Sequence, residues 1–286
     1  EMEYAVRGAI PQRAAELRKQ GRTTIPCNIG NPQALGQKPM TYYRQVLGLA
    51  EDPSKIARER RLKAALAGSD GFEESDFISD YVLDLAEDFL DRMETGTGAY
   101  SESQGPAFIR EAVAAFIDRR DSIDGASVVP ANPDDIFITN GASEGVKYVI
   151  DLLLGNENDG IMIPIPQYPL YSAAVKRCGG IQVNYYPDEE DGWTFDRSVL
   201  DEAYTDAAND GVNVKGIVVI NPGNPTGAVV DENTVREVIA FAKEKGLVII
   251  ADEVYQENVY GSKFISFASM LGSEQAPLFS LHSMSK

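Results

Sequence analysis

In the first third of the chain, apolar residues recur with the spacing of an α-helix. Residues 5–20 carry charges in their second half and are followed by Gly21, which is typical of a helix that ends there. Residues 55–67 and 76–93 also show helical periodicity. A loop rich in Pro, Gly and Asn is expected over residues 25–36. The residues predicted to share one face of the last helix are Phe77, Tyr81, Leu85, Phe89 and Met93.

From Phe108 onwards, helical segments alternate with short apolar segments. Residues 216–220 and 247–251 are apolar throughout and do not alternate with polar residues. Strands with this pattern are buried on both faces, as in parallel sheets that helices cover. The pattern therefore predicts an α/β fold with a mostly parallel central sheet and flanking helices. The expected strands are 135–139, 160–165, 181–186, 216–220, 247–251 and 278–282, and the expected helices are 109–120, 143–154, 171–178 and 233–245.

Composition and charge narrow the class of protein. The 286 residues are 43% hydrophobic and 24% charged, which is typical of a soluble globular protein. The net charge of −18 repels phosphate groups, so neither nucleic acid nor an anionic membrane surface is an expected partner. The two cysteines, Cys27 and Cys178, match no metal-ligand spacing, and no metal is expected. We expect a cytoplasmic protein, or a mitochondrial one if a transit peptide was removed before residue 1.

Ligands of open α/β sheets bind beyond the carboxyl ends of the strands, so the residues after each apolar run are candidate site residues. Residues 140–145 (NGASEG) follow one such run and open a helix. Small residues such as Ala142 and Ser143 let the backbone approach an anion, and a helix N-terminus supplies N–H groups and partial positive charge. The segment is a candidate phosphate site. A capped helix start with a Gly turn is the alternative.

Two further candidates follow the next buried runs. Residues 221–227 (NPGNPTG) form a tight loop in which Asn224 can present its amide at the sheet edge, although a purely structural turn is the alternative. Asp252 comes directly after the apolar run 247–251. A carboxylate there costs free energy unless it is paired, and a cationic ring nitrogen is a suitable partner. The alternative is that Asp252 caps the next element.

The last apolar run is followed by Ser283, Met284, Ser285 and Lys286. A lysine at a strand end can act as a Schiff-base nucleophile, although a lone lysine is more often a solvated surface charge. His282 is the only histidine, which leaves little for a triad of the Ser-His-Asp type. Together the four segments offer one partner each for the phosphate, phenolic oxygen, ring nitrogen and aldehyde of pyridoxal 5′-phosphate (PLP).

These motifs carry a family resemblance over nearly the whole chain. The chain resembles the class I/II aminotransferases of PLP fold type I, and most closely the alanine aminotransferases. The family's Asn-Pro-Thr-Gly stands at 224–227, its Asp-Glu-Val-Tyr at 252–255 and its Ser-x-Ser-Lys at 283–286. The longer strings 28–33 (NIGNPQ), 98–101 (GAYS), 103–105 (SQG) and 164–171 (PIPQYPLY) are similar to those of alanine aminotransferases.

The resemblance implies a role for each matching residue. Lys286 would bind the cofactor covalently and move the substrate proton, and Asp252 would pair with the ring nitrogen. Tyr168 would stack on the ring, and Tyr255 and Asn224 would bond its phenolic oxygen. Ala142, Ser143 and Ser283 would bind the phosphate. Gly30 would help place the substrate carboxylate, and Tyr100 would reach the phosphate of the neighbouring subunit, which implies a homodimer.

The resemblance also implies the domain organisation and the reaction. Residues 1–94 would form an N-terminal arm and part of a small α/β domain, and residues 95–286 the large PLP-binding domain, with a C-terminal portion expected beyond residue 286. The implied reaction transfers the amino group of L-alanine to 2-oxoglutarate, giving pyruvate and L-glutamate. The alternatives are a glutamate:glyoxylate or other aminotransferase, a PLP lyase, a PLP-binding transcriptional regulator and an inactive relative.

Overall fold

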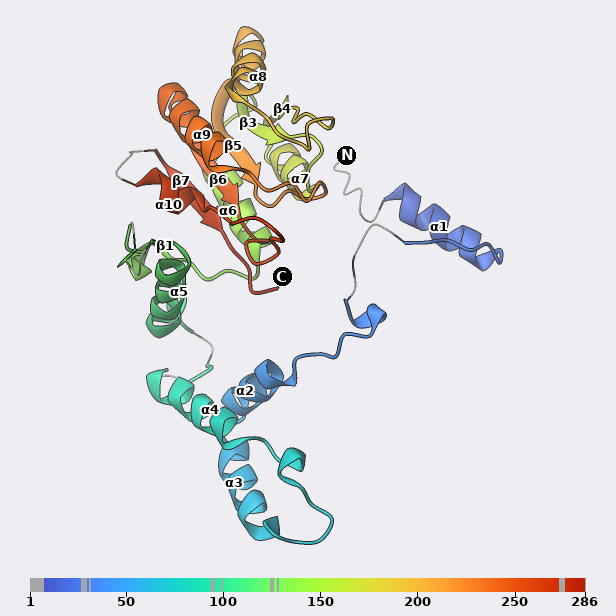
Figure 1. The fold of residues 1–286 in the computed structure, drawn as a ribbon, viewed down its shortest axis with the longest axis vertical. Coiled ribbons are helices and arrows are strands. Elements are labelled where there is room, and N and C mark those ends of the chain that lie inside the picture. The colour runs from blue at the N-terminus through green and yellow to red at the C-terminus, as the bar shows by residue number, and fades with distance from the viewer. Residues whose placement is uncertain are drawn as a thin grey trace. The chain divides into compact units, whose positions relative to one another are not determined.

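The computed structural model describes residues 8–26, 30, 32–93, 96–98, 100–123, 126–127, 129–272 and 276–285. The chain divides into two compact units, and each is described by itself. Unit 1 comprises Glu1–Pro26, Ala115–Ala131 and Thr139–Lys286, and unit 2 comprises Cys27–Ala114 and Asn132–Ile138. Figure 1 labels the elements along the chain. In the described part of the chain, no helix is long and apolar enough to cross a membrane.

Unit 2 is built from helices that pack around a small apolar core. The core is made by Val46, Leu49, Ile56, Val82, Leu83 and Ala86. Exposed ion pairs join the surfaces of its helices, such as Lys63 with Asp80 at 2.8 Å, and pairs of this kind stabilise only weakly. Its helices are α2 (Thr41–Glu51), α3 (Ser54–Leu66), α4 (Asp80–Arg92) and the first half of α5 (Ala107–Arg120), with short 3-10 turns at Pro32–Leu35, Glu74–Asp76 and Pro133–Asp135.

The shared face predicted for the helix over residues 76–93 holds only in part, since Leu85 and Phe89 pack against the core. Helix α4 begins at Asp80, because the side chain of Ser79 caps it by accepting a hydrogen bond from the Val82 amide. Phe77 therefore lies outside the helix, and the buried face is made by Val82, Leu83 and Ala86. The Tyr81 side chain is 66% exposed and stacks on Tyr42, with ring centroids 6.1 Å apart.

The predicted strand over residues 135–139 is also absent. Pro133–Asp135 forms a 3-10 turn, and the Ile138 amide donates to the Gln104 carbonyl instead of joining a sheet. Buried Arg110 holds this region together, since it donates to the carbonyls of Gly105 at 2.9 Å and Pro133 at 2.7 Å. The backbone hydrogen bonds of the segment are thus made to loops, which period-two hydrophobicity alone does not reveal.

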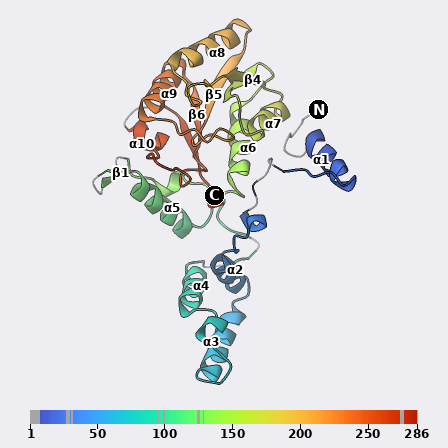
Figure 2. The ribbon, with the colours of Figure 1, turned by 45° about the vertical axis from the view of Figure 1, so that its right-hand side comes forward.

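Unit 1 contains a five-stranded parallel sheet whose strand order is β4-β3-β5-β6-β7. Helices cover both faces of the sheet, as Figure 2 shows for α6 and α7 on one side and α8 and α9 on the other. The predicted α/β fold with a mostly parallel sheet is confirmed. The strands are β3 (Asp159–Pro164), β4 (Ile181–Tyr185), β5 (Asn213–Ile220), β6 (Val248–Asp252) and β7 (Leu278–Leu281).

The central strands are apolar throughout because each face of the sheet has its own core. Ile217 and Val219 of β5 pack with helices α8, α9 and α10, whereas Val218 and Ile220 pack with α6 and α7. The local signals of the chain fit this arrangement: Asp231 caps the start of α9, and Gly246 ends it in the left-handed conformation with φ 68°. The helices are α6 (Ala142–Leu153), α7 (Leu170–Arg177), α8 (Arg197–Asn209), α9 (Glu232–Lys245) and α10 (Phe267–Leu271).

Two smaller elements complete unit 1. Helix α1 (Ala9–Lys19) buries none of its residues. Strands β1 (Ser122–Ile123) and β2 (Ala126–Ser127) form a short antiparallel pair after α5. Helices α2, α8 and α10 were not predicted, whereas the other predicted helices and the five strands of the parallel sheet lie within a few residues of the expected bounds.

Candidate functional site

The candidate site lies at the carboxyl edge of the parallel sheet in unit 1. Asp252, the last residue of β6, stands opposite Ile220 at the end of β5 and Leu281 at the end of β7. Backbone hydrogen bonds continue the register beyond the strands, since the Asn221 amide donates to the Asp252 carbonyl and the Glu253 amide donates to the Leu281 carbonyl, both at 2.9 Å. The segments after β5, β6 and β7 therefore leave the sheet side by side.

Asp252 presents a buried carboxylate at this edge. The residue is 6% exposed, and its Oδ2 accepts a hydrogen bond from the Tyr171 hydroxyl at 2.7 Å. Burial, followed by the negative charge of Asp252, raises the pKa of Tyr171 well above its usual value, so the hydroxyl remains a donor. A buried carboxylate favours a cationic partner, and this environment suits a protonated ring nitrogen.

Asn224 and Tyr255 approach each other above the same edge. The Asn224 Nδ2 donates to the Tyr255 hydroxyl at 3.4 Å. The amide and the phenol are therefore close enough to donate hydrogen bonds to the same oxygen atom of a ligand. The loop that carries Asn224 is held by buried Asn221, whose side chain accepts from the Val230 amide at 3.0 Å and donates to the Ile265 carbonyl at 3.3 Å. The loop also requires glycine at 223, because a Cβ there would overlap the Thr226 hydroxyl.

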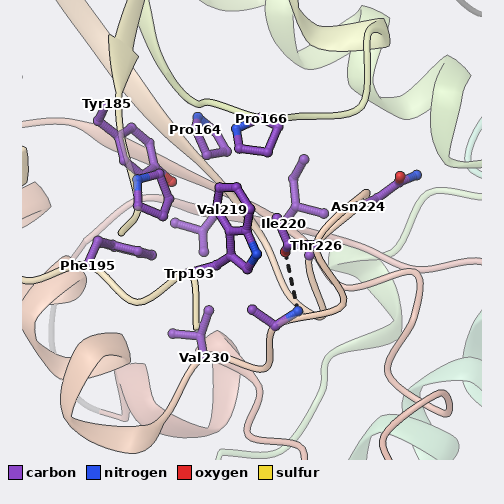
Figure 3. A pocket seen from close by; sticks show the side chains of 13 residues that line it. Pro164, Pro166, Tyr185, Trp193, Phe195, Val219, Ile220, Asn224, Thr226 and Val230 are labelled. Carbon is purple, nitrogen blue, oxygen red and sulfur yellow. Dashed lines mark hydrogen bonds between the residues drawn. The ribbon is translucent and has the colours of Figure 1, made fainter. Parts of the chain in front are cut away.

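A small apolar pocket supports this loop from behind. Its volume is about 40 Å³, room for about one water molecule and far less than a cofactor needs. Figure 3 shows the indole of Trp193, the only tryptophan, among prolines and aromatic side chains, while Asn224 points away from them. Trp193 takes the left-handed conformation with φ 67°, and its amide donates to the Asp188 carbonyl at 2.6 Å. The pocket therefore packs against the loop that carries Asn224, which is one of its lining residues.

The N-terminus of α6 provides backbone donors at the same edge. Its N-cap is Gly141, with φ 76°, which has no side chain to cap the helix. Ala142 and Ser143 form the start of the first turn, where the amide groups have no partner within the helix. Helix α6 packs against the end of β7, because a Cβ at Gly145 would lie 3.1 Å from the Leu281 side chain. An anion at this N-terminus would be stabilised by the amides and by the helix dipole.

The segment after β7 brings a serine to the edge. Half-buried Ser283 makes a hydrogen bond with the Ser285 hydroxyl at 2.7 Å, and its Oγ accepts from the Ser285 amide at 3.2 Å. Tyr168, half-buried, follows β3 and precedes α7, which starts at the same edge. Lys286, the predicted covalent anchor, lies outside the described residues.

The remaining predicted residues belong to unit 2. Gly30 is exposed and precedes the 3-10 turn Pro32–Leu35. Tyr100 is 90% exposed, in the loop before α5. Their predicted roles toward the substrate and toward a second subunit stay predictions.

Two residues of the edge were missed by the sequence interpretation. Tyr171 was noted only as part of a string, and its bond to Asp252 joins positions 81 residues apart along the chain, which no local pattern shows. Asn221 was treated as part of a turn, although it is fully buried. A buried side-chain amide directly after an apolar strand was a usable signal, because such groups must be hydrogen-bonded.

The polar groups at the edge fit PLP. The first turn of α6 suits a phosphate, Asn224 with Tyr255 suits a phenolic oxygen, and the Asp252 carboxylate suits a protonated pyridine nitrogen. These groups come from the ends of neighbouring strands or from the helices that follow them, which is where ligands of open α/β sheets bind.

Comparisons with known proteins agree with this chemistry. The family model "Aminotransferase class I and II" matches residues 73–286. The chain is 44% identical to alanine aminotransferase 2 of Panicum miliaceum, over 99% of the chain and 58% of that protein. It is 39% identical to glutamate–glyoxylate aminotransferase 2 of Arabidopsis thaliana, over 99% of the chain and 57% of that protein. A solved structure of alanine aminotransferase from Pyrococcus furiosus is similar over 100% of the chain and 58% of that chain, with 26% identity and a TM-score of 0.71. The chain thus spans a little over half the length of these relatives.

Proposed function

Starting from the premise that the chain belongs to the class I and class II aminotransferase family, we propose that the protein transfers the amino group of L-alanine to 2-oxoglutarate. The products are pyruvate and L-glutamate. One observation carries the proposal: the buried Asp252 carboxylate, held by the Tyr171 hydroxyl at the carboxyl edge of the sheet. An oriented buried carboxylate between two polar loops is what a protonated pyridine ring requires.

Membership of this family implies PLP as the cofactor. When bound, PLP supplies an electron sink that stabilises negative charge at the α-carbon of an amino acid. Asp252 keeps the ring nitrogen protonated, because an opposite charge nearby favours the charged form of a base. Tyr171 keeps Asp252 pointed at that nitrogen, since its hydroxyl stays protonated in its buried position.

Other residues orient the cofactor. Asn224 and Tyr255, which lie within 3.4 Å of each other, would bond its phenolic oxygen and so fix the rotation of the ring. Ala142 and Ser143 at the start of α6, with Ser283 after β7, hold the phosphate through amide and hydroxyl donors. Tyr168 would cover one face of the ring and keep water from it. Fixed dipoles of this kind favour the charge that develops during reaction without having to reorganise.

With PLP bound, Lys286 would carry the proton between the substrate carbon and the cofactor. A lysine that is desolvated near cationic groups has a lowered pKa and is therefore a better nucleophile and base. Its proposed role follows from the Ser-x-Ser-Lys motif and from the direction of β7, whose carboxyl end stands beside Asp252. Gly30 is proposed to help place the substrate carboxylate.

We propose that the protein acts as a homodimer in which Tyr100 of each subunit reaches the phosphate site of the other. Two observations support this proposal. One is the family motif at 98–101. The other is Tyr100, a large aromatic side chain that is 90% exposed in the single chain. A two-fold interface of this kind completes two sites at once. We place the protein in the cytoplasm, where the two thiols of the chain stay reduced.

Substrate preference is tested with the bound cofactor as the indicator. We expect L-alanine and L-glutamate to abolish the visible absorbance of the protein that carries PLP, and 2-oxoglutarate to restore it. L-Aspartate and L-tyrosine should react much more slowly, and a faster reaction with either would contradict the proposal. Glyoxylate that restored the absorbance faster than 2-oxoglutarate would favour the second candidate, glutamate–glyoxylate transfer, to which the 39% identical relative points.

A further inference from the structure

Behind the edge that carries Asp252, three polar side chains meet in the interior of unit 1. Glu253, the residue after β6, is fully buried. Its Oε1 accepts a hydrogen bond from the Phe267 amide at 2.8 Å. Among the described residues, no hydrogen-bond donor reaches its Oε2, which faces the Nε2 of His282 at 3.6 Å. A buried carboxylate oxygen that accepts no hydrogen bond requires a physical explanation.

His282 connects this carboxylate to the end of α5. It is the residue after β7, and its Nδ1 lies 3.3 Å from the Nη1 of Arg120. A guanidinium can only donate, so the Nδ1 must accept in this contact. The proton of the neutral imidazole is then on Nε2, the nitrogen that faces Glu253 Oε2. Burial, followed by the charge of Arg120, lowers the pKa of His282 to about 4, so the ring is neutral at neutral pH.

Arg120 is itself held rigidly. Its Nε and Nη2 donate to the two carboxylate oxygens of Asp121 at 2.7 and 2.6 Å, and its Nη1 also donates to Gln256 at 2.6 Å. The guanidinium lies over the Phe264 ring, 5.6 Å from the centroid. A bidentate and stacked arginine has a fixed geometry. The fixed Arg120 guanidinium therefore determines which nitrogen of His282 carries the proton.

We infer that Glu253, acting through His282, is a positioning residue that ties the segment bearing Ser283 and Lys286 to the strand end bearing Asp252. The inference rests on the proposed function. The Glu253 amide already bonds the Leu281 carbonyl, and one residue beyond the strands the side chains of Glu253 and His282 face each other at 3.6 Å. The direction in which residues 283–285 leave the sheet is then fixed relative to Asp252.

The groups that face Glu253 decide its charge. They are Arg120 and Asp121 at the end of α5, Asp252 in β6, His282 after β7 and the Phe267 amide at the start of α10. Burial raises the pKa of Glu253 to about 7, against the lowering effects of the Phe267 amide and Arg120. The ionised carboxylate suits the Nε2–H of His282, whereas the protonated form presents a second donor to it.

The first test uses the unaltered protein with its cofactor. His282 is the only histidine, so a long-range ¹H–¹⁵N spectrum of the imidazole nitrogens reports on it without assignment. We expect the Nε2–H form near pH 7, protonation only well below pH 6, and a smaller shift of the signals with a midpoint near pH 7 as Glu253 titrates. An Nδ1–H form, or a charged imidazole at pH 7, overturns the inference.

The second test uses Glu253→Gln with Glu257→Gln as the matched control, because Glu257 is exposed in the same segment. The amide introduced by Glu253→Gln would keep an acceptor for Phe267 and turn its NH₂ toward the Nε2–H of His282. We expect this variant to lose the midpoint near pH 7 in the imidazole signals, to alter the pH titration of the cofactor absorbance and to lower kcat by about tenfold to 100-fold, since small misplacements of reacting groups cost that much.

The control should match the unaltered protein in all three readouts. If the Glu253→Gln variant also matched it in the imidazole signals and the cofactor titration, the inference would be wrong. If the unaltered protein took up no PLP, the proposed function would fail instead, and the imidazole spectrum would still decide the tie between Glu253 and His282. The two failures are therefore distinguishable.

Discussion

The hydroxyl of Tyr171 donates a hydrogen bond to the carboxylate of Asp252 at 2.7 Å, and both side chains are buried. Tyr171 lies at the start of α7 and Asp252 at the end of β6, so the bond joins the layer of helices on one face to the edge of the sheet. A hydrogen bond to a charged group contributes about 1.5–3 kcal/mol. The bond therefore orients Asp252 and stabilises its ionised form.

Replacing Tyr171 with Phe should lower kcat by about tenfold to 100-fold, because the lost bond to a charged acceptor corresponds to one to two powers of ten in rate. The pH titration of the cofactor absorbance should shift as the carboxylate moves away from the ring nitrogen. Tyr185→Phe is the matched control, since Tyr185 is equally buried and donates to the Val218 carbonyl at 2.8 Å in the interior.

In urea unfolding, Tyr185→Phe should lose about 1 kcal/mol, and Tyr171→Phe about 1.5–3 kcal/mol because its acceptor is charged. Only Tyr171→Phe should change the cofactor spectrum and kcat. Equal effects of the two substitutions on kcat would mean that the Tyr171 bond has no special role in positioning Asp252.

Glu253→Gln should make the stability of the protein less dependent on pH between about pH 4.5 and pH 7. The pKa of Glu253 is raised by burial from about 4.5 to about 7, so the folded state binds more protons than the unfolded state between these values. Its contribution to stability is complete below pH 4.5 and is lost as the pH rises through 7. The loss amounts to at most about 3 kcal/mol, at about 1.4 kcal/mol for each pKa unit.

The measurement compares unfolding of the variant and of the unaltered protein at pH 5 and pH 8. The variant should gain stability relative to the unaltered protein on going from pH 5 to pH 8. His282 contributes with the opposite sign, since its lowered pKa reduces stability as the pH falls from about 6.5 to 4, and its titration is followed in both proteins through the imidazole signals. A constant difference at the two pH values would contradict the prediction.

The shared site of the proposed homodimer is tested by mixing two variants, Tyr100→Phe and Lys286→Ala, each with little activity. In a mixed dimer, one site carries both substitutions and the other carries neither, so part of the activity should return. The formation of mixed dimers is checked with two affinity tags. Mixed dimers that form without any return of activity would show that Tyr100 acts within its own subunit.

The features that the sequence predicted well depend on burial along a single element. Residues 216–220 and 247–251 are apolar throughout because helices cover both faces of β5 and β6, and a continuous apolar run is the direct record of that burial. The polar residues at the ends of these runs follow from the chain order alone. Asn224 and Asp252 could therefore be placed at one edge before the structure was known.

The features that were missed depend on contacts between distant segments or on caps. Helix α8 was missed although Asp196 caps it by accepting from the Ser198 and Val199 amides, which was a usable signal. The shared face predicted for α4 holds only in part because Ser79 shifts the helix start past Phe77. The bond of Tyr171 to Asp252 and the contact of His282 with Arg120 span 81 and 162 residues, and only the fold brings these pairs together.

The central claim is that the carboxyl edge of this sheet binds PLP and presents Lys286 to it. Borohydride reduction of the protein saturated with PLP, followed by digestion and mass spectrometry, tests it most directly. The protein should be yellow before reduction, and one pyridoxyl group per chain should be found on Lys286. A label on a different lysine, or no label in a protein that is shown to be folded, would contradict the claim.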